Sequence, residues 1–296
     1  MNTMDLHMHS DYSCDGTYRP AKLMDLCKEA GMTTVALTDH DCARGNREAA
    51  ARAKELGIRF VPGVELNCVC QGYDLHLLGY GIDSDDKRML ALEEHSLELS
   101  RKGSADRMQI LKELGIYFDE EKLWAESWKG KIVPHQFAKS ALADERNRNH
   151  PLMKELFPGG SRSDNAPLNF FWDVCALGKP AYVKINHISF EEAHQLIMDL
   201  GGVSVLAHPG QSIGKDPEVI RYMVGHGLEG IEINCSYHTE EQSLYYEELA
   251  RELHALKTPG SDFHGTLKPN VHMGQVLGNI YEEDVEALLR MIQERR

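Results

Sequence analysis

The sequence predicts an α/β protein, with strands and helices alternating around a parallel sheet or barrel and a helical segment inserted in the chain. The first eighty residues alternate short apolar or β-branched runs with helical patterns. The same alternation returns at Phe190, whereas the charge-rich stretch in between has a helical pattern throughout. We therefore expect one domain from residues 1–84 and 179–296 and a helical insert at 85–178.

The first domain segment is expected to hold a strand at residues 4–9 and a helix at 20–30. The helix has Pro20 at its start and Gly31 just after its end, which are common start and stop signals. Further strands are expected at 33–37 and 58–66. A second helix is expected at 47–56, ended by Gly57, and a short apolar run follows at 75–80. These elements would form successive strand–helix units.

The second domain segment repeats this rhythm. A helix is expected to begin at Pro217, because Asp216 can cap it and proline fits the first helical position. The other expected helices cover residues 190–200, 240–256 and 282–295, and the strands cover 203–207, 228–234 and 258–262. The alternation thus continues to the end of the chain.

Composition excludes several classes of protein. The 296 residues carry a formal net charge of −14, which disfavours charge-driven binding of long nucleic acid. A nucleotide substrate stays possible, because bound cations reverse the local charge. No apolar run is long enough to span a membrane, and no signal-peptide pattern is present. Together with seven scattered cysteines, this predicts a cytoplasmic protein without disulfides or membrane partners.

The expected first strand ends in a His-x-His pair. His7 and His9 are two residues apart, so in a strand they point to the same face and can share a metal ion. The carboxyl ends of strands are where α/β and barrel enzymes place their sites. Asp15 follows six residues after His9 in a turn-like stretch and can reach back to the same ion.

Other expected strands end in similar residues. A polar group at the end of an apolar strand is costly to bury unless it is satisfied. The residues at these ends are His40, Glu65, His76, His208, Asp262 and His264. Imidazole mixed with carboxylate suits Zn, Mn or Fe, and clustered ions of this kind activate water and clamp a phosphoryl group. The pattern therefore predicts a centre of two or three divalent ions.

These motifs, in this order, resemble the polymerase and histidinol phosphatase (PHP) family. The resemblance covers roughly residues 3–80 and 180–270, from the His7 stretch through Thr38-Asp39-His40 and Gly63-Val64-Glu65 to Ala207-His208-Pro209 and Ser261-Asp262-Phe263-His264. It implies a distorted (β/α)7 TIM-like barrel, with the helical insert covering the active site. The subgroup of small stand-alone phosphoesterases is the most similar.

The resemblance also implies the ligand set. The ligands would be His7, His9, Asp15, His40, Glu65, His76, His208, Asp262 and His264, with Glu65 bridging two ions. Many stand-alone members have a step of five residues before the aspartate, whereas the step to Asp15 is six, as in other branches of the family. As our own hypothesis of the mechanism, His208, His264 and Asp262 are in addition catalytic, with His208 or His264 relaying a proton.

Substrate contacts are less well defined by the resemblance. The subgroup commonly has an arginine two residues before a histidine of the insert, where this chain has Val133-Pro134-His135. We predict that His135 contacts substrate and that another cation replaces the arginine. The candidates are Lys184, Arg19 and Arg44, and His238 is a further candidate for substrate contact.

The expected function is hydrolysis of small nucleotide phosphates, of the 3′,5′-bisphosphonucleotide or nucleoside monophosphate type, by a metal-bound hydroxide. The alternatives are a 5′–3′ exonuclease acting on short oligonucleotides, a histidinol-phosphate phosphatase, and a metal-binding regulatory module without catalysis. An amidohydrolase is less well supported, because no metal-bridging lysine stands at a strand end.

Overall fold

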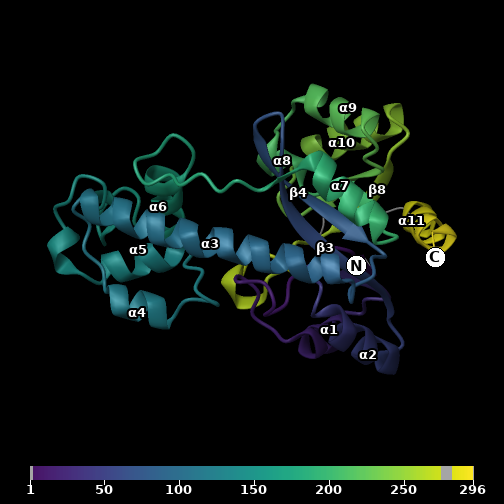
Figure 1. Cartoon of the computed structure of the whole chain (residues 1–296), viewed down its shortest axis with the longest axis horizontal. Helices are drawn as coiled ribbons and strands as arrows, with labels where there is room; N and C mark the ends of the chain where they lie inside the picture. Colours follow the sequence, from purple (N-terminus) through teal and green to yellow (C-terminus); the bar gives the residue numbers. More distant parts are fainter. Residues whose placement is uncertain (1–2, 275–281, 296) are drawn as a thin grey trace. The chain divides into compact units, whose positions relative to one another are not determined.

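The computed structural model describes residues 3–274 and 282–295 and divides the chain into two compact units (Figure 1). The first comprises the residues up to Glu93 and from His187 onward, and the second is Glu94–Asn186. The boundaries differ from the expected positions 85 and 178. Helix α3 (Lys87–Glu113) begins in the first unit, where Met89 joins the core, and Ala181 packs into the core of the second.

The first unit is built on a sheet with the strand order β1-β2-β3-β4-β6-β7-β8. The strands are β1 (Met4–Asp5), β2 (Thr34–Leu37), β3 (Arg59–Cys70), β4 (Tyr73–Tyr80), β6 (Val203–Leu206), β7 (Gly230–Cys235) and β8 (Leu256–Gly260), and β5 (Ile188–Ser189) pairs with β3. The chain after β1 meets the last strand, since the Leu6 N–H donates to the Pro259 carbonyl at 3.1 Å and Met8 pairs with Phe263. The seven strands thus form a nearly closed barrel, which confirms the predicted fold class.

The parallel direction expected for the strands does not extend to β4. This strand is antiparallel to both β3 and β6, because it follows β3 through a tight hairpin instead of a helix. The hairpin turn is Gln71-Gly72, and both residues have positive φ, 48° and 88°. Such a turn matches the twist of paired strands. The hairpin places His76 opposite Asn67 of β3 and so beside Glu65.

Helices cover the barrel of the first unit. They are α1 (Pro20–Glu29), α2 (Asn46–Leu56), α7 (Phe190–Asp199), α8 (Pro209–Ser212), α9 (Pro217–Gly225), α10 (Glu240–Glu252) and α11 (Glu282–Glu294). Leu23 and Ala49, from α1 and α2, pack against Val35 of β2. Helix α9 begins as predicted, with the Asp216 carboxylate accepting from the Glu218 N–H. None of the helices in the described ranges is both long and apolar enough to cross a bilayer.

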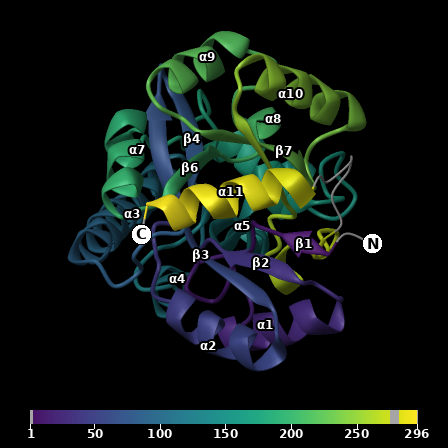
Figure 2. The same ribbon diagram turned by 90° about the vertical axis from the view of Figure 1, so that its right-hand side faces the viewer.

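Helix α11 crosses the end of the barrel where the parallel strands begin (Figure 2). Its buried side chains Leu288 and Ile292 pack with Val203 at the start of β6. Lys257, near the start of β8, pairs with Asp284 at the start of this helix at 3.0 Å. This end is therefore filled by apolar side chains, and the opposite end carries the polar residues.

In the second unit the described regular elements are helical, apart from one bridge between Trp128 and Lys131. Besides most of α3, they are α4 (Glu120–Ala125), α5 (Pro134–Leu142), α6 (Ala166–Phe170), two 3₁₀ turns (Glu145–Asn147 and Lys154–Leu156) and a π-helical turn (Phe171–Cys175). Leu111, Phe137 and Phe170 are fully buried in a core of this unit's own. This unit therefore has the hydrophobic core that an inserted domain needs.

Candidate metal centre

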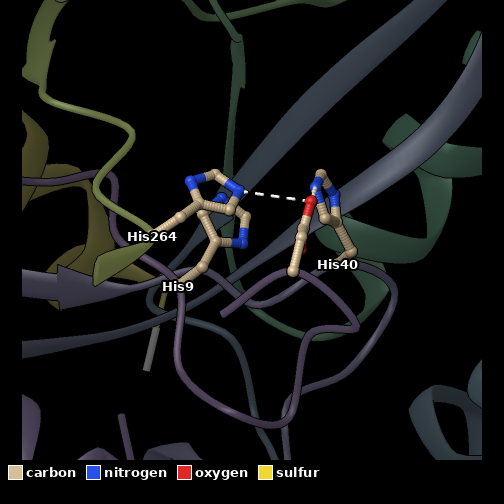
Figure 3. Close-up of side chains that lie close together, drawn as sticks. His9, His40 and His264 are labelled. Atoms are coloured by element: carbon tan, nitrogen blue, oxygen red, sulfur yellow. Dashed lines mark ion pairs between the residues drawn. The ribbon is translucent and has the colours of Figure 1, made fainter. Parts of the chain in front are cut away.

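The nine residues predicted as ligands come together in the first unit, at the carboxyl ends of its parallel strands. His7 and His9 follow β1, His40 follows β2, His208 follows β6, and Asp262 and His264 follow β8. Glu65 lies within β3, His76 near the start of β4, and Asp15 in the loop before α1. Figure 3 shows His9, His40 and His264 turned toward one another. Residues up to 257 positions apart in sequence (His7 to His264) therefore share one site.

Glu65 lies at the centre of this cluster and is fully buried. Its Oε2 atom lies 3.2 Å from His7 Nε2, 3.1 Å from His9 Nε2 and 3.1 Å from His40 Nδ1. Its Oε1 atom lies 2.8 Å from His76 Nδ1 and 3.0 Å from His208 Nε2. The two oxygens thus face different histidines, as a carboxylate that bridges two ions would.

The two oxygens of Asp262 have different surroundings. Oδ1 faces inward, 2.9 Å from His9 Nε2 and 3.3 Å from His7 Nε2. Oδ2 accepts hydrogen bonds from the Tyr237 hydroxyl at 2.7 Å and from Lys268 Nζ at 3.1 Å. The outer contacts hold the carboxylate so that Oδ1 is directed at the histidines.

Asp15 lies at the edge of the cluster, with its side chain 29% exposed. Its Oδ2 atom is 3.4 Å from His264 Nε2 and 3.7 Å from His40 Nε2. His264 in turn stacks on His9, with ring centroids 4.1 Å apart. The longer step from His9 to Asp15 therefore does not keep this carboxylate away from the other residues.

Eight of the nine predicted ligands, all except His208, fall into three overlapping groups, each compact enough to hold one ion. The groups are His9, Asp15, His40 and His264; His7, His9, Glu65 and Asp262; and His40, Glu65 and His76. Within each group the nitrogen and oxygen atoms all lie within 4.8 Å of one another. Imidazole nitrogen with carboxylate oxygen is a donor set that suits Zn, Mn or Fe.

Unsatisfied buried atoms are concentrated in this site. A buried polar atom without a hydrogen-bond partner is rare in a native protein and requires an explanation. Eight of the nine residues carry such an atom: His7 Nε2, His9 Nε2, Asp15 Oδ1, His40 Nδ1, Glu65 Oε2, His208 Nδ1, Asp262 Oδ1 and His264 Nε2. Bound cations would satisfy atoms of this kind, so the residues fit a metal centre.

The charges of the site also favour cations. Burial disfavours protonation of His9, but hydrogen bonds to Asp262 and Glu65 outweigh it and raise the pKa of His9 to about 9. Burial likewise disfavours the charged form of Asp262, yet the neighbouring His264, His7 and Lys268 hold its pKa well below the usual range. Without metal, a protonated His9 would thus offset part of the carboxylate charge, and a divalent ion would replace its proton.

Asp39, Ser10 and Ser13 form hydrogen bonds beside His9 and His40 and were not predicted as site residues. The buried Asp39 carboxylate accepts from the Ser10 N–H at 2.7 Å and from the Ser13 hydroxyl at 3.0 Å. Ser13 Oγ lies 3.1 Å from His9 Nδ1 and accepts from the His40 N–H at 2.9 Å. The polar cluster at the end of β2 was visible in the sequence, but its partners come from another loop.

Glu232 was also missed. It lies on β7, is fully buried, and contacts His7 Nδ1 at 3.0 Å and the His208 N–H at 2.8 Å. The available signal was an acidic residue between the two isoleucines of the strand Gly230–Cys235. Tyr237 and Lys268, which hold Asp262, follow β7 and β8 without any distinguishing motif.

The predicted substrate contacts lie in varied surroundings. His238 is buried, with Nδ1 2.8 Å from the Ile233 carbonyl and Nε2 accepting from the Gly210 N–H, so both ring nitrogens are occupied by backbone. Arg19 pairs with Glu48 at 2.8 Å, and Arg44 with Glu93 at 2.6 Å. His135 is the second residue of α5, and Lys184 lies between the π-helical turn and β5, both in the second unit.

Comparisons with known proteins show which family this chain resembles. Residues 5–145 match the model of the PHP domain. The chain is 31% identical to the 3′,5′-nucleoside bisphosphate phosphatase of Chromobacterium violaceum over 274 residues, covering 89% of this chain and 88% of the relative. It is 28% identical to a 5′-3′ exoribonuclease of Haemophilus influenzae over 264 residues, covering 88% of this chain and 89% of that relative.

A solved structure shares the fold along nearly the whole chain. It is described as an amidohydrolase from Chromobacterium violaceum with bound sulfate, and it superimposes with a TM-score of 0.75 at 27% identity, covering 99% of this chain and 96% of that one. Fold, site geometry and sequence similarity agree, and the chain belongs to the PHP family of metal-dependent phosphoesterases.

Proposed function

We propose that this phosphoesterase hydrolyses phosphate esters of small nucleotides, of the 3′,5′-bisphosphonucleotide or nucleoside monophosphate type. The observation that carries the proposal is the concentration of eight unsatisfied buried nitrogen and oxygen atoms in this one site. The substrate class is supported by the 31% identity to a nucleoside bisphosphate phosphatase over most of both chains. The net charge of −14 disfavours long nucleic acid as substrate.

The nine predicted residues would hold two or three divalent ions, with Mn, Zn and Fe as the candidates. Ions bound in this way polarise phosphoryl oxygens and lower the pKa of water. Glu65 would hold two ions at a fixed separation, because its two oxygens face different histidines. Asp15, at the more exposed edge of the cluster, would hold an ion together with the buried His264.

His208 and His264 are proposed to move protons in addition to binding metal. His208 Nδ1 is buried without a partner, and His264 Nδ1 donates to the Asp262 carbonyl at 2.7 Å. The second interaction fixes the ring so that Nε2 is directed into the site. Asp262, which we propose to be catalytic, is held in turn by Tyr237 and Lys268. That the insert covers the site, and that His135 and Lys184 contact substrate, stay predictions.

The test is a turnover screen combined with two substitutions. The full chain, supplied with Mn or Zn, is assayed on nucleoside mono- and bisphosphates, histidinol phosphate and short RNA. Turnover should be highest on the nucleotides and fall by at least about 100-fold in His9→Ala and Asp262→Ala, since each removes a ligand. Lys54→Ala on α2, an exposed position, is the control and should keep full activity. Full turnover in both ligand variants would contradict the proposal.

A second candidate is trimming of short oligonucleotides from the 5′ end. The 28% identity to an exoribonuclease over most of both chains favours it. The same screen separates the two functions, because an exonuclease would turn over short RNA faster than any mononucleotide. No comparable observation favours histidinol phosphate, and its turnover is measured in parallel.

A further inference from the structure

Glu232 occupies an unusual position for an acidic residue. It lies in the middle of β7, a strand that supplies none of the nine predicted ligands, and its side chain is fully buried. Burying a carboxylate is costly unless each oxygen is satisfied. Oε1 lies 3.0 Å from His7 Nδ1, and Oε2 accepts from the His208 N–H at 2.8 Å. One side chain therefore contacts two predicted ligands from different strands.

The contact with His7 determines which ring nitrogen carries the proton. Nε2 of His7 faces Glu65 Oε2 at 3.2 Å and Asp262 Oδ1 at 3.3 Å. An imidazole that donates from Nδ1 to a carboxylate keeps the Nε2 lone pair for a metal ion, and such a partner increases the affinity of the histidine for the ion. Glu232 is placed to fix His7 in this tautomer.

The contact with His208 stabilises an uncommon backbone conformation. His208 has φ 24° and ψ 58°, a left-handed conformation rare for residues other than glycine, and it precedes Pro209. The Glu232 carboxylate accepts the N–H of this residue. The resulting turn directs His208 Nε2 to within 3.0 Å of Glu65 Oε1. Without this acceptor, His208 would lose a contact that holds its ring beside Glu65.

A glycine in the neighbouring strand makes room for this arrangement. A Cβ atom at Gly260, the last residue of β8, would overlap both His7 Cβ and Glu232 Oε1. The backbone of β8 therefore lies against the pair formed by His7 and Glu232. The position of the carboxylate is thus fixed by packing on one side and by hydrogen bonds on the other.

We propose that Glu232 is a positioning residue of the metal centre, which fixes the tautomer of His7 and the turn at His208 and thereby sets the affinity for metal. This inference rests on the proposed metal centre. Glu232 itself would touch neither ion nor substrate. His7 and His208 face different oxygens of Glu65, so the Glu232 carboxylate would position a histidine at each of these two oxygens.

The test compares Glu232→Gln with Glu229→Gln in the full chain. Glutamine keeps the size of the side chain, but it has a single acceptor oxygen, so it cannot accept from both His7 Nδ1 and the His208 N–H. Glu229 is a matched control, because it directly precedes β7 and also accepts a backbone N–H, from Ser204 at 2.9 Å. After treatment with a chelator, each protein is titrated with Zn(II) alone in competition with an indicator. Glu232→Gln should bind about 10- to 100-fold more weakly than wild type, and Glu229→Gln like wild type.

Further measurements separate positioning from a loss of structure. The metal-free variants should have the circular dichroism of the wild type, excess metal should restore much of the turnover of Glu232→Gln, and its Co(II) absorption spectrum should change. If Glu232→Gln does not fold, Glu232→Asp, which keeps the charge but shortens the reach, should also weaken binding. Wild-type affinity in whichever variant folds would overturn the inference. Because binding is measured without substrate, inactivity on phosphate esters would contradict the proposed function alone.

Discussion

At the scale of single residues, the site depends on which way each side chain is turned. Asp262 shows this best, since one oxygen faces His9 and His7 while the other is held by Tyr237 and Lys268. A ligand held by its outer contacts loses little freedom when it binds an ion, and such contacts commonly increase metal affinity. We therefore expect the residues around the predicted ligands to contribute to metal binding although they would not touch the ion.

Tyr237→Phe should weaken this support. The substitution removes the hydroxyl that donates to Asp262 at 2.7 Å and keeps the ring, which packs edge-on against His208. A hydrogen bond to a charged group is worth about 1.5 kcal/mol or more, so metal affinity or kcat should fall by about tenfold.

The matched control is Tyr222→Phe, which removes a hydroxyl that donates to Glu191 at 2.8 Å on the surface. Metal titration and steady-state kinetics are measured for both variants. Equal effects of the two substitutions would show that the contact with Asp262 has no special importance.

At the scale of elements, the sequence predicted the presence of the strands better than their lengths and directions. The side-chain alternation that placed His7 and His9 on one face is confirmed by their shared contact with Glu65. The first strand, however, ends at Asp5 in place of residue 9, because the following residues pair with the chain after β8. Local patterns predict that a strand exists, but its length depends on the partner that the fold provides.

Helix α11 offers a test of the separation between stability and catalysis. Leu288 is fully buried against the end of the barrel where the parallel strands begin, opposite the metal centre. Leu288→Ala should lower the free energy of unfolding by about 2–5 kcal/mol, because it leaves a cavity. Since the site lies at the other end, kcat at a temperature where the variant is folded should stay within about twofold of wild type.

Arg290→Ala is the control for this prediction, since Arg290 is exposed on the same helix. Its effect on stability should be within about 0.5 kcal/mol. Thermal or urea unfolding of both variants gives the comparison. A large loss of turnover in folded Leu288→Ala would mean that α11 influences the site.

At the scale of the whole molecule, the metal centre should link stability and pH. With no ion bound, hydrogen bonds to Asp262 and Glu65 raise the pKa of His9 to about 9, which favours its protonated form at neutral pH. A histidine must lose its proton before it can bind metal. Metal binding at neutral pH should therefore release protons.

The affinity for metal should consequently rise with pH. For each such proton the apparent affinity increases by up to about tenfold per pH unit below the pKa, so Zn(II) should bind at least about tenfold more tightly at pH 8 than at pH 6.5. Titration at the two pH values, and proton release into weak buffer, check this. Removal of metal with a chelator should lower the Tm, because an ion that binds only the folded state stabilises it. An affinity for Zn(II) that is the same at both pH values, with no proton released on binding, would contradict the prediction.

The sequence by itself determined which residue types gather at the strand ends, and from these it predicts the metal ligands. Parallel strands bring their carboxyl ends to one edge, so His, Asp and Glu residues at successive strand ends converge whatever the details of packing. Only the tertiary structure decided the antiparallel direction of β4, the position of the unit boundaries and the contacts of Asp39, Glu232 and Lys268. These features depend on which segments become neighbours, and a contact between residues far apart in the chain leaves no periodic pattern in the sequence.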